Sequence, residues 1–406
     1  MKMLRSLSVA AFAAGAILAA TAPAVAQREL VIGVNDALTG PGAVYGLPQA
    51  NSVQMAAREI NAAGGIRVGT TVYNLRVVQY DDKANPTEAT NSVRRLLDRD
   101  GAKFLLGFCC SGPTSAVASF IGREDAVMLV GNAAERAITT QGIQNLFRTR
   151  PPADYTGAAA GRFVAAQGPR RIAVIGSLEV GFYVQYLDAF EKEFAKSGGT
   201  IVAKESFGLR DRDMTPQLTK IRALNPDAIL VIGYVEPAAF VYRQSVELGL
   251  NVRRYGFTSG SEDQFLRVAT SQQMEGVWDL RPTELTMESA SPAGVRYEAN
   301  YRAAFGATPA PSSPYAYDQV YVLKHALERA GTVTDTKRVA EVIRTAPIPP
   351  EAVMRYLPVG GRMFDENGQA YTTNAAFQWR NGRWVFVEDL PSDPADYSRF
   401  LRGLRQ

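Results

Sequence analysis

The fold is decided by residues 30–65, which read LVIGVNDALTGPGAVYGLPQANSVQMAAREINAAGG. A short run rich in β-branched residues at 30–34 predicts a strand, and the longer amphipathic stretch at 45–63 predicts a helix that ends at two glycines. The same alternation of short and long segments continues along the chain. It is typical of parallel β-sheets covered by helices, so we expect an α/β protein.

Two such arrays follow one another. The first has expected strands at 30–34, 72–80, 104–109 and 126–130 and expected helices at 45–63, 85–99 and 113–122. The second starts after a pair of prolines, with expected strands at 171–176, 200–206, 228–233 and 254–258 and expected helices at 185–196, 215–224, 237–248 and 263–270. The arrays predict two Rossmann-like lobes with parallel sheets and a central ligand cleft at the carboxyl ends of the strands.

The last part of the chain has a different pattern. Three helical stretches at 294–305, 315–330 and 336–344 precede a hairpin, whose Asn381-Gly382 pair suits a tight turn. Helices followed by one hairpin cannot form a third full domain, so we assign the helices to the first lobe and the hairpin to the second. Lobe 1 would comprise residues 27–150 plus 281–352, lobe 2 would comprise 151–280 plus 353–406, and the chain would cross between them three times.

The first 26 residues have the order of a secretory signal. Lys2 and Arg5 precede an apolar stretch at 7–20, and a small-residue triplet ends at Ala26. The apolar stretch is shorter than the ~20 residues that a bilayer span requires. We therefore predict cleavage after Ala26 and export of a soluble protein.

Composition, charge and the absence of certain motifs argue against several classes of function. The 406-residue chain has a formal net charge of +4, and loss of Lys2 and Arg5 leaves +2. Its basic residues are scattered, so we expect no nucleic-acid partner. His325 is the only histidine and falls in a helical stretch, where a partly buried surface position is expected. The sequence lacks the motifs for zinc, dithiol, elbow-serine and nucleotide-phosphate sites, so we expect no metal, no cofactor and no enzyme activity.

Candidate ligand groups lie in the loops that follow the expected strands. They are Tyr45, Cys110, Ser111, Gly112, Asn132, Ala133 and Ala134 in the first lobe and Tyr183, Tyr234 and Ser259 in the second. Ser111 stands at a helix start, where it could help free N–H groups to bind a carboxylate or could cap its own helix. The two second-lobe tyrosines could flank an apolar ligand or serve packing. Asp81-Asp82 directly follows a strand and is expected to form a solvated turn.

Cys109 and Cys110 are the only cysteines, and because they are adjacent they cannot link distant parts of the chain. Three interpretations stay open for them. They could be small buried residues at a strand end, a strained vicinal disulfide, or reactive thiols.

With these residues the chain resembles the leucine/isoleucine/valine-binding proteins, which are type I periplasmic binding proteins of bacterial ABC importers. The resemblance covers essentially the whole mature length. It is carried by Val31-Ile32-Gly33-Val34, Leu38-Thr39-Gly40-Pro41, Tyr45-Gly46, Glu59-Ile60-Asn61-Ala62-Ala63-Gly64-Gly65-Ile66, Asp81-Asp82 and the Cys110-Ser111 loop. It implies hinge closure on a small ligand, no catalysis, a periplasmic location, a permease partner in the inner membrane and a monomeric state.

Carried over position by position, the resemblance places the ligand carboxylate at Ser111 and the ligand termini at the backbone of residues 132–134. Tyr45 and Tyr234 match tyrosines of the family. The family disulfide would join Cys110 to a position that is Ala84 here, so that bridge is absent.

Two departures concern the α-ammonium of an amino acid. The family has a threonine and an acidic residue where this chain has Ala134 and Ser259. A buried ammonium without a counter-charge costs several kcal/mol, which disfavours a free amino acid unless Glu236 or Glu262 substitutes.

The sequence therefore predicts the solute-binding component of an ABC importer. Its ligand would be a small hydrophobic amino acid of the leucine/isoleucine/valine type or a related apolar or aromatic carboxylate. Two other classes stay open, namely an exported α/β enzyme with a cysteine nucleophile and a ligand sensor for a membrane receptor.

Overall fold

The computed structural model describes residues 27–283, 291–395 and 397. The predicted signal at 1–26 lies outside the described residues, as does the end of the predicted second lobe beyond residue 397. Among the residues that are described, none of the helices combines the length and the apolar character that crossing a bilayer requires.

The first sheet has six strands. Their order is β2 (Ile66–Val68), β3 (Thr71–Asp81), β1 (Gln27–Asp36), β4 (Phe104–Gly107), β5 (Val127–Val130) and β6 (Leu146–Arg148). Neighbouring strands are parallel except β2, which forms an antiparallel hairpin with β3. The connections contain α1 (Ala43–Ala62), α2 (Pro86–Asp98), α3 (Ser111–Ile121) and the short α4 (Ala137–Thr140).

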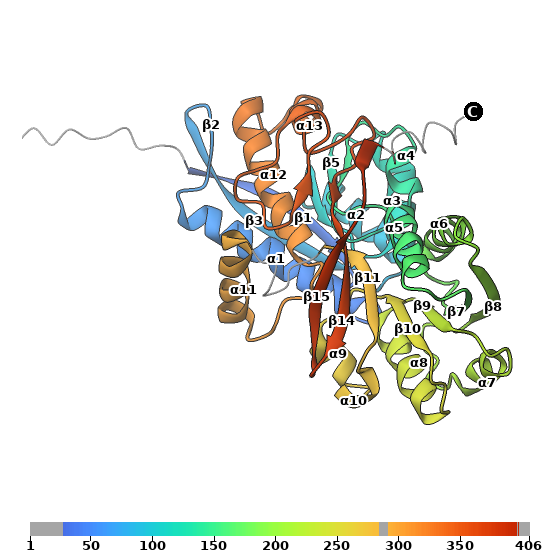
Figure 1. Cartoon of the computed structure of the whole chain (residues 1–406). Helices are drawn as coiled ribbons and strands as arrows, with labels where there is room; N and C mark the ends of the chain where they lie inside the picture. Colours follow the sequence, from blue (N-terminus) through green and yellow to red (C-terminus); the bar gives the residue numbers. More distant parts are fainter. Residues whose placement is uncertain (1–26, 284–290, 396, 398–406) are drawn as a thin grey trace, which may run out of the picture.

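The second sheet has seven strands. Their order is β15 (Arg383–Leu390), β14 (Asn374–Arg380), β11 (Trp278–Pro282), β10 (Arg253–Phe257), β9 (Ala228–Ile232), β7 (Arg171–Gly176) and β8 (Thr200–Ser206). Its helices are α5 (Ala153–Ala166), α6 (Tyr183–Ala195), α7 (Thr215–Ala223), α8 (Val235–Glu247), α9 (Glu262–Leu266) and α10 (Ser271–Met274). The two sheets form two bodies, which confirms the predicted two-lobe α/β fold (Figure 1).

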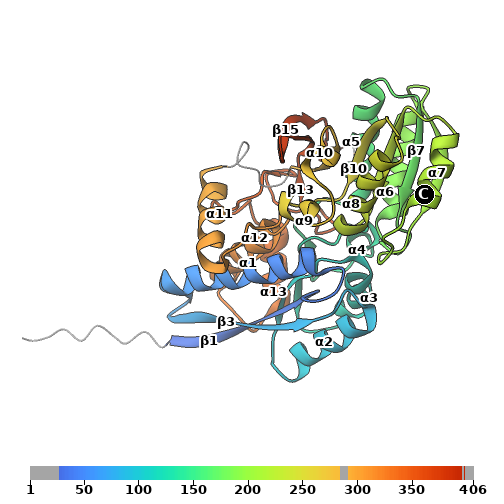
Figure 2. The same ribbon diagram turned by 90° about the horizontal axis from the view of Figure 1, so that it is seen from below.

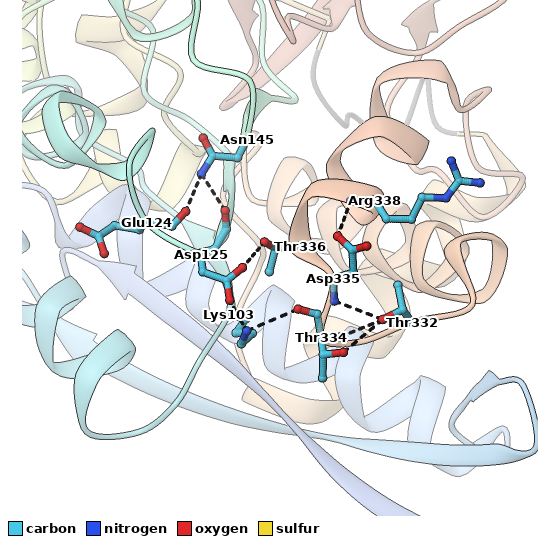
Figure 3. A network of polar contacts seen from close by, with 10 residues as sticks. Lys103, Glu124, Asp125, Asn145, Thr332, Thr334, Asp335, Thr336 and Arg338 are labelled. Carbon is cyan, nitrogen blue, oxygen red and sulfur yellow. Dashed lines mark hydrogen bonds and ion pairs between the residues drawn. The ribbon is translucent and has the colours of Figure 1, made fainter.

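The three late helices lie with the first sheet. They are α11 (Pro292–Phe305), α12 (Pro314–Ala330) and α13 (Thr336–Thr345), and α11 and α12 lie beside α1 in both views (Figure 2). Buried tyrosines such as Tyr297 and Tyr315 share one hydrophobic cluster with Ile32 and Val53 of the first lobe. A polar network attaches the start of α13 to the same lobe, because the Asp125 carboxylate accepts hydrogen bonds from Lys103 and Thr336 (Figure 3).

The terminal hairpin lies with the second sheet, where β14 pairs antiparallel with β11 and with β15. Asn381 and Gly382 form its turn with φ values of 52° and 85°. Two consecutive positive φ values are characteristic of the tight hairpin turn that this residue pair favours. A smaller pair, β12 (Tyr356–Leu357) with β13 (Tyr371–Thr372), lies in the segment that leads to the hairpin. The residue limits that the sequence analysis gives for the two lobes stay a prediction.

Several elements differ from the sequence-based expectation. α5, β6 and β11 were not expected, because α5 consists largely of small residues and the two strands are short, with buried arginines that interrupt their apolar pattern. The helix expected at 263–270 ends at Leu266, and Thr270 instead caps α10 by accepting a hydrogen bond from Gln273 N at 3.2 Å.

The prediction of a solvated Asp81-Asp82 turn is wrong for Asp82, whose side chain is buried. The carboxylate of Asp82 accepts hydrogen bonds from Asn35 Nδ2 at 2.9 Å and from the backbone N–H of Ala84 at 2.8 Å. Desolvation raises the pKa of Asp82 to about 6. The turn is therefore part of the packed first lobe.

Asp318 on α12 connects the late helices to the segment that returns to the second lobe. It is fully buried, and its two carboxylate oxygens accept hydrogen bonds from the backbone N–H groups of Val353 at 2.8 Å and Met354 at 3.0 Å. Burial nevertheless raises the pKa of Asp318 to about 7. The folded protein thus holds a proton that the unfolded chain releases near pH 4.

We expect raising the pH from 5 to 8 to lower the free energy of unfolding. Because the pKa of Asp318 is higher in the folded state, its stabilising contribution is complete below the unfolded pKa and is lost as the pH rises through 7. Its share of the decrease over this range is about 2–3 kcal/mol. Urea unfolding at pH 5, 6, 7 and 8 measures it.

The variant Asp318→Asn should lose the part of this pH slope that Asp318 supplies, while the smaller part from Asp82, whose pKa is about 6, remains. Its overall stability should also fall, because one backbone N–H loses its acceptor, so the slope is the readout. Asp188→Asn, at an exposed position of α6, is the matched control and should keep the slope. An unchanged slope in Asp318→Asn would show that the proton is held elsewhere.

Candidate ligand-binding cleft

Ten side chains from both lobes surround a small cavity between the sheets. They are Tyr45, Cys109, Ser111, Asn132, Arg150, Phe182, Tyr234, Phe257, Thr258 and Ser259. Nearly all of them stand at or just after the carboxyl end of a parallel strand, as expected for an α/β cleft. The cavity has a volume of about 20 Å³, roughly the room of one water molecule. An organic ligand can therefore enter only when the lobes move apart.

Direct contacts join the lobes across the cleft. The hydroxyl of Tyr45 donates a hydrogen bond to Thr258 O at 2.8 Å, and the Tyr45 ring meets the edge of Tyr234 with centroids 5.2 Å apart. Burial raises the pKa of Tyr45, so the hydroxyl keeps its proton. A Cβ at Gly181 would lie 3.2 Å from Ser111 Cβ, which shows how closely the second lobe approaches. The arrangement is a closed clamp.

Ser111 connects two loops of the first lobe. It is the first residue of α3, and its Oγ accepts hydrogen bonds from the backbone N–H groups of Ala134 and Glu135, both at 3.2 Å. The alternative that Ser111 caps its own helix is therefore wrong. The N-cap residue is Cys110, which makes no side-chain cap bond. The hydroxyl thus holds the 132–135 loop against the helix start, where N–H groups favour a negative charge.

The sequence analysis did not identify Arg150. This residue follows β6 and is only 4% exposed. Its guanidinium donates a hydrogen bond from one terminal nitrogen to Asn132 O at 3.2 Å and lies 5.4 Å from the centroid of Phe257. The only signal in the sequence was the spacing of Arg148 and Arg150 directly after the apolar pair 146–147, which is compatible with an exposed loop.

Three buried polar atoms of the cavity residues have no hydrogen-bond partner among the residues that the structure describes. They are Nε of Arg150, Oδ1 of Asn132 and Oγ of Ser259. Buried polar atoms in native proteins are usually paired, so such atoms in a cleft are candidates for contact with a ligand. Ser259 also has a positive φ of 56°. Its backbone N–H is bonded to the carboxylate of Asp279 at 3.2 Å, which fixes this conformation.

The predicted site residues divide into two sets. Five of the ten line the cavity: Tyr45, Ser111, Asn132, Tyr234 and Ser259. The other five do not: Cys110, Gly112, Ala133, Ala134 and Tyr183. For all of these except Ala134 a chain neighbour lines the cavity instead, as Phe182 does beside Tyr183, whose ring packs over Gly176. Whether these residues bind a ligand stays a prediction.

The two acidic residues considered as partners for an ammonium lie outside the cavity lining. The side chain of Glu236 is 58% exposed and lies 3.6 Å from Arg212. Glu262 accepts a hydrogen bond from the backbone N–H of Trp384 at 2.9 Å. Behind the lining, Asp279 is buried in an ion pair with Arg281 at 3.1 Å, and its oxygens accept from the 258–259 loop.

Both cysteines are buried and free, which is the first of the three interpretations given for them. Burial raises the pKa of Cys109, so its thiol is protonated at neutral pH. A Cβ at Gly42 would lie 2.9 Å from both Ala84 Cβ and Cys110 Sγ. Ala84 is therefore near Cys110, as the family disulfide implies, but without a sulfur to bond.

His325 lies on α12, far along the chain from the cavity residues. Its side chain is 29% exposed, and Nε2 lies 2.7 Å from a carboxylate oxygen of Glu351. This is the partly buried surface position that the sequence predicts. Over the described ranges, no three His, Cys, Asp or Glu side chains are grouped in a way that could hold a metal ion.

The chain matches a known protein family over most of its length. The family model described as "Periplasmic binding protein" matches residues 29–383. The chain belongs to this family. Periplasmic binding proteins of this kind bind small molecules and work with the permeases of ABC transporters.

Curated proteins are similar to the chain in sequence, and solved structures share its fold. The Leu/Ile/Val-binding protein BraC3 of Rhizobium johnstonii is 26% identical over 369 residues, which cover 90% of this chain and 95% of the relative. Among solved structures, LivJ of Streptococcus pneumoniae in complex with isoleucine has a TM-score of 0.77 at 23% identity and covers 89% of this chain and 99% of its own. A solute-binding protein of R. palustris in complex with benzoate has a TM-score of 0.77 at 17% identity, with 90% and 98% coverage.

The binding protein should carry two free thiols. A chromogenic thiol reagent should report two thiols per chain after unfolding in guanidinium without reductant, and should react slowly with the native protein because both side chains are buried. Detection of no thiol after unfolding would instead indicate a vicinal disulfide.

Proposed function

We propose that this binding protein delivers a small hydrophobic solute to an ABC permease. The solute would be an amino acid of the leucine/isoleucine/valine type or a related apolar or aromatic carboxylate, captured by hinge closure in the periplasm. The monomer, released after cleavage at Ala26, would carry the solute to its permease partner in the inner membrane. Relatives with the same fold were solved with isoleucine and with benzoate, which supports this range of ligands.

The observation that carries the proposal is the composition of the cleft. Aromatic rings of Tyr45, Phe182, Tyr234 and Phe257 come from both lobes, and three other lining residues carry buried polar atoms without partners. Apolar walls with a few convergent polar groups are the usual make-up of a small-molecule site. Because the walls belong to both lobes, binding and closure are coupled.

The alternative of an exported enzyme with a cysteine nucleophile lacks support. A nucleophilic cysteine needs a lowered pKa or a neighbouring base, whereas burial raises the pKa of Cys109. The only histidine, His325, is absent from the cavity lining and faces Glu351. We therefore propose a binding function without catalysis.

A ligand should raise the unfolding temperature of the mature protein. A solute that binds only the native state contributes ~2.7 kcal/mol at a hundredfold excess over its dissociation constant. Thermal unfolding with leucine, isoleucine, benzoate and other small carboxylates measures this shift. If no member of the panel shifts the transition, the proposed ligand range is wrong.

Ser111→Ala should weaken binding of any solute found in this screen. The hydroxyl holds the 132–135 loop at the helix start, and loss of such hydrogen bonds near a charged ligand costs about 1–3 kcal/mol. Isothermal titration calorimetry measures the difference. The matched control is Ser119→Ala on the exposed side of the same helix, where the hydroxyl bonds only to Ala116 O. Equal affinities in both variants would remove Ser111 from the site.

A further inference from the structure

We propose that the cleft selects a monocarboxylate with an apolar or aromatic body and without an α-ammonium group, and that the Arg150 guanidinium is its counter-charge. This inference rests on the proposed function and names the ligand class of the same cleft.

Arg150 is a buried cation without an ion-pair partner in the described chain. The residue is only 4% exposed, yet within the described chain it forms no ion pair and its Nε has no hydrogen-bond partner. Its interactions are one hydrogen bond to Asn132 O and the approach to the Phe257 ring. A buried charge is costly unless it is paired, and a guanidinium is shaped to bind a carboxylate through two parallel hydrogen bonds. The protein leaves that pairing to the ligand.

Arg150 also occupies a well-anchored position in the fold. It lies where the chain first crosses between the lobes, directly before Pro151-Pro152 and the start of α5. The backbone is held on both sides, since Thr149 N donates to Val130 O at 2.9 Å and Gln369 Nε2 donates to Arg150 O at 2.6 Å. Gln369 belongs to the last crossing segment. The backbone that carries the charge is thus anchored to the first lobe and to the last crossing segment.

The charge balance of the cavity lining disfavours a ligand with an ammonium group. Arg150 is the only charged side chain among the ten lining residues, and the other polar ones are hydroxyls, an amide and a thiol. An α-ammonium would enter a space with one buried positive charge and no carboxylate in its lining. The carboxylates next to the lining residues already have partners in the protein. Asp279 is committed to Arg281 and to the backbone of Thr258 and Ser259. Asp36 accepts a hydrogen bond from the backbone N–H of Cys109, and Glu135 accepts one from Ser115 Oγ. A carboxylate without an ammonium neutralises the site, and a zwitterion does not.

The decisive ligand comparison uses leucine and 4-methylpentanoate, which has the leucine skeleton without the amino group. A second pair is benzoate and benzamide, which differ in charge but have nearly the same shape. With the mature wild-type protein, calorimetry should show that 4-methylpentanoate binds about tenfold or more tighter than leucine, and that benzoate is preferred to benzamide by a similar factor.

The variants assign this preference to Arg150. Arg150→Gln should reduce the preference of acid over amide to near unity, while Arg150→Lys should retain part of it because the charge remains but the planar fork is lost. A purely structural role for Arg150 would lower acid and amide affinities together and leave their ratio unchanged. Circular dichroism and the unfolding temperature report whether each variant folds. If one variant does not fold, the other decides the assignment to Arg150, and the wild-type comparison decides the ligand class in either case.

Three experimental results would contradict the inference, and they separate it from the proposed function. If leucine binds the wild-type protein as tightly as 4-methylpentanoate does, this inference is overturned while the proposed function stands. If the acid–amide ratio survives in a folded Arg150→Gln, another group supplies the charge and the inference is likewise wrong. If no compound binds at all, both the inference and the proposed ligand range fail.

Discussion

The direction of the parallel strands is the constraint on which the site depends. Parallel strands place all their carboxyl ends at one edge of a sheet, so loops far apart in sequence meet there. In the first lobe β4, β5 and β6 deliver Ser111, Asn132 and Arg150, and in the second β7, β9 and β10 deliver Phe182, Tyr234 and Thr258. Because the two edges face each other, two lobes can build one cavity.

This constraint explains why much of the cleft could be predicted from sequence. Strands such as β1 and β9 are recognisable by their β-branched residues, and the loop after each strand then becomes a candidate. Tyr45 and Ser111 were found in this way. Beside Tyr183 it is Phe182 that lines the cavity, since the helix start orients Phe182 toward the cavity and turns the tyrosine into the lobe, and sequence does not show that rotation.

Charges were harder to place than apolar residues. Asp82 was predicted to be solvated, and Arg150 was not identified as a site residue, because a charged residue in a loop is usually exposed. Their burial comes from tertiary contacts. Asp82 is covered by Asn35 and the Ala84 backbone, and Arg150 lies between loops that are 18 and 219 residues away along the chain. Short strands with internal arginines, β6 and β11, were missed for the same reason.

The bond between Tyr45 and Thr258, and that between Gln264 and Val44 O at 3.0 Å, involve only protein atoms. They favour closure whether or not a solute is held, and therefore set the resting ratio of shut to open molecules. A molecule that is shut while empty cannot admit a solute. The strength of these two bonds thus also sets how often the cleft is open for capture.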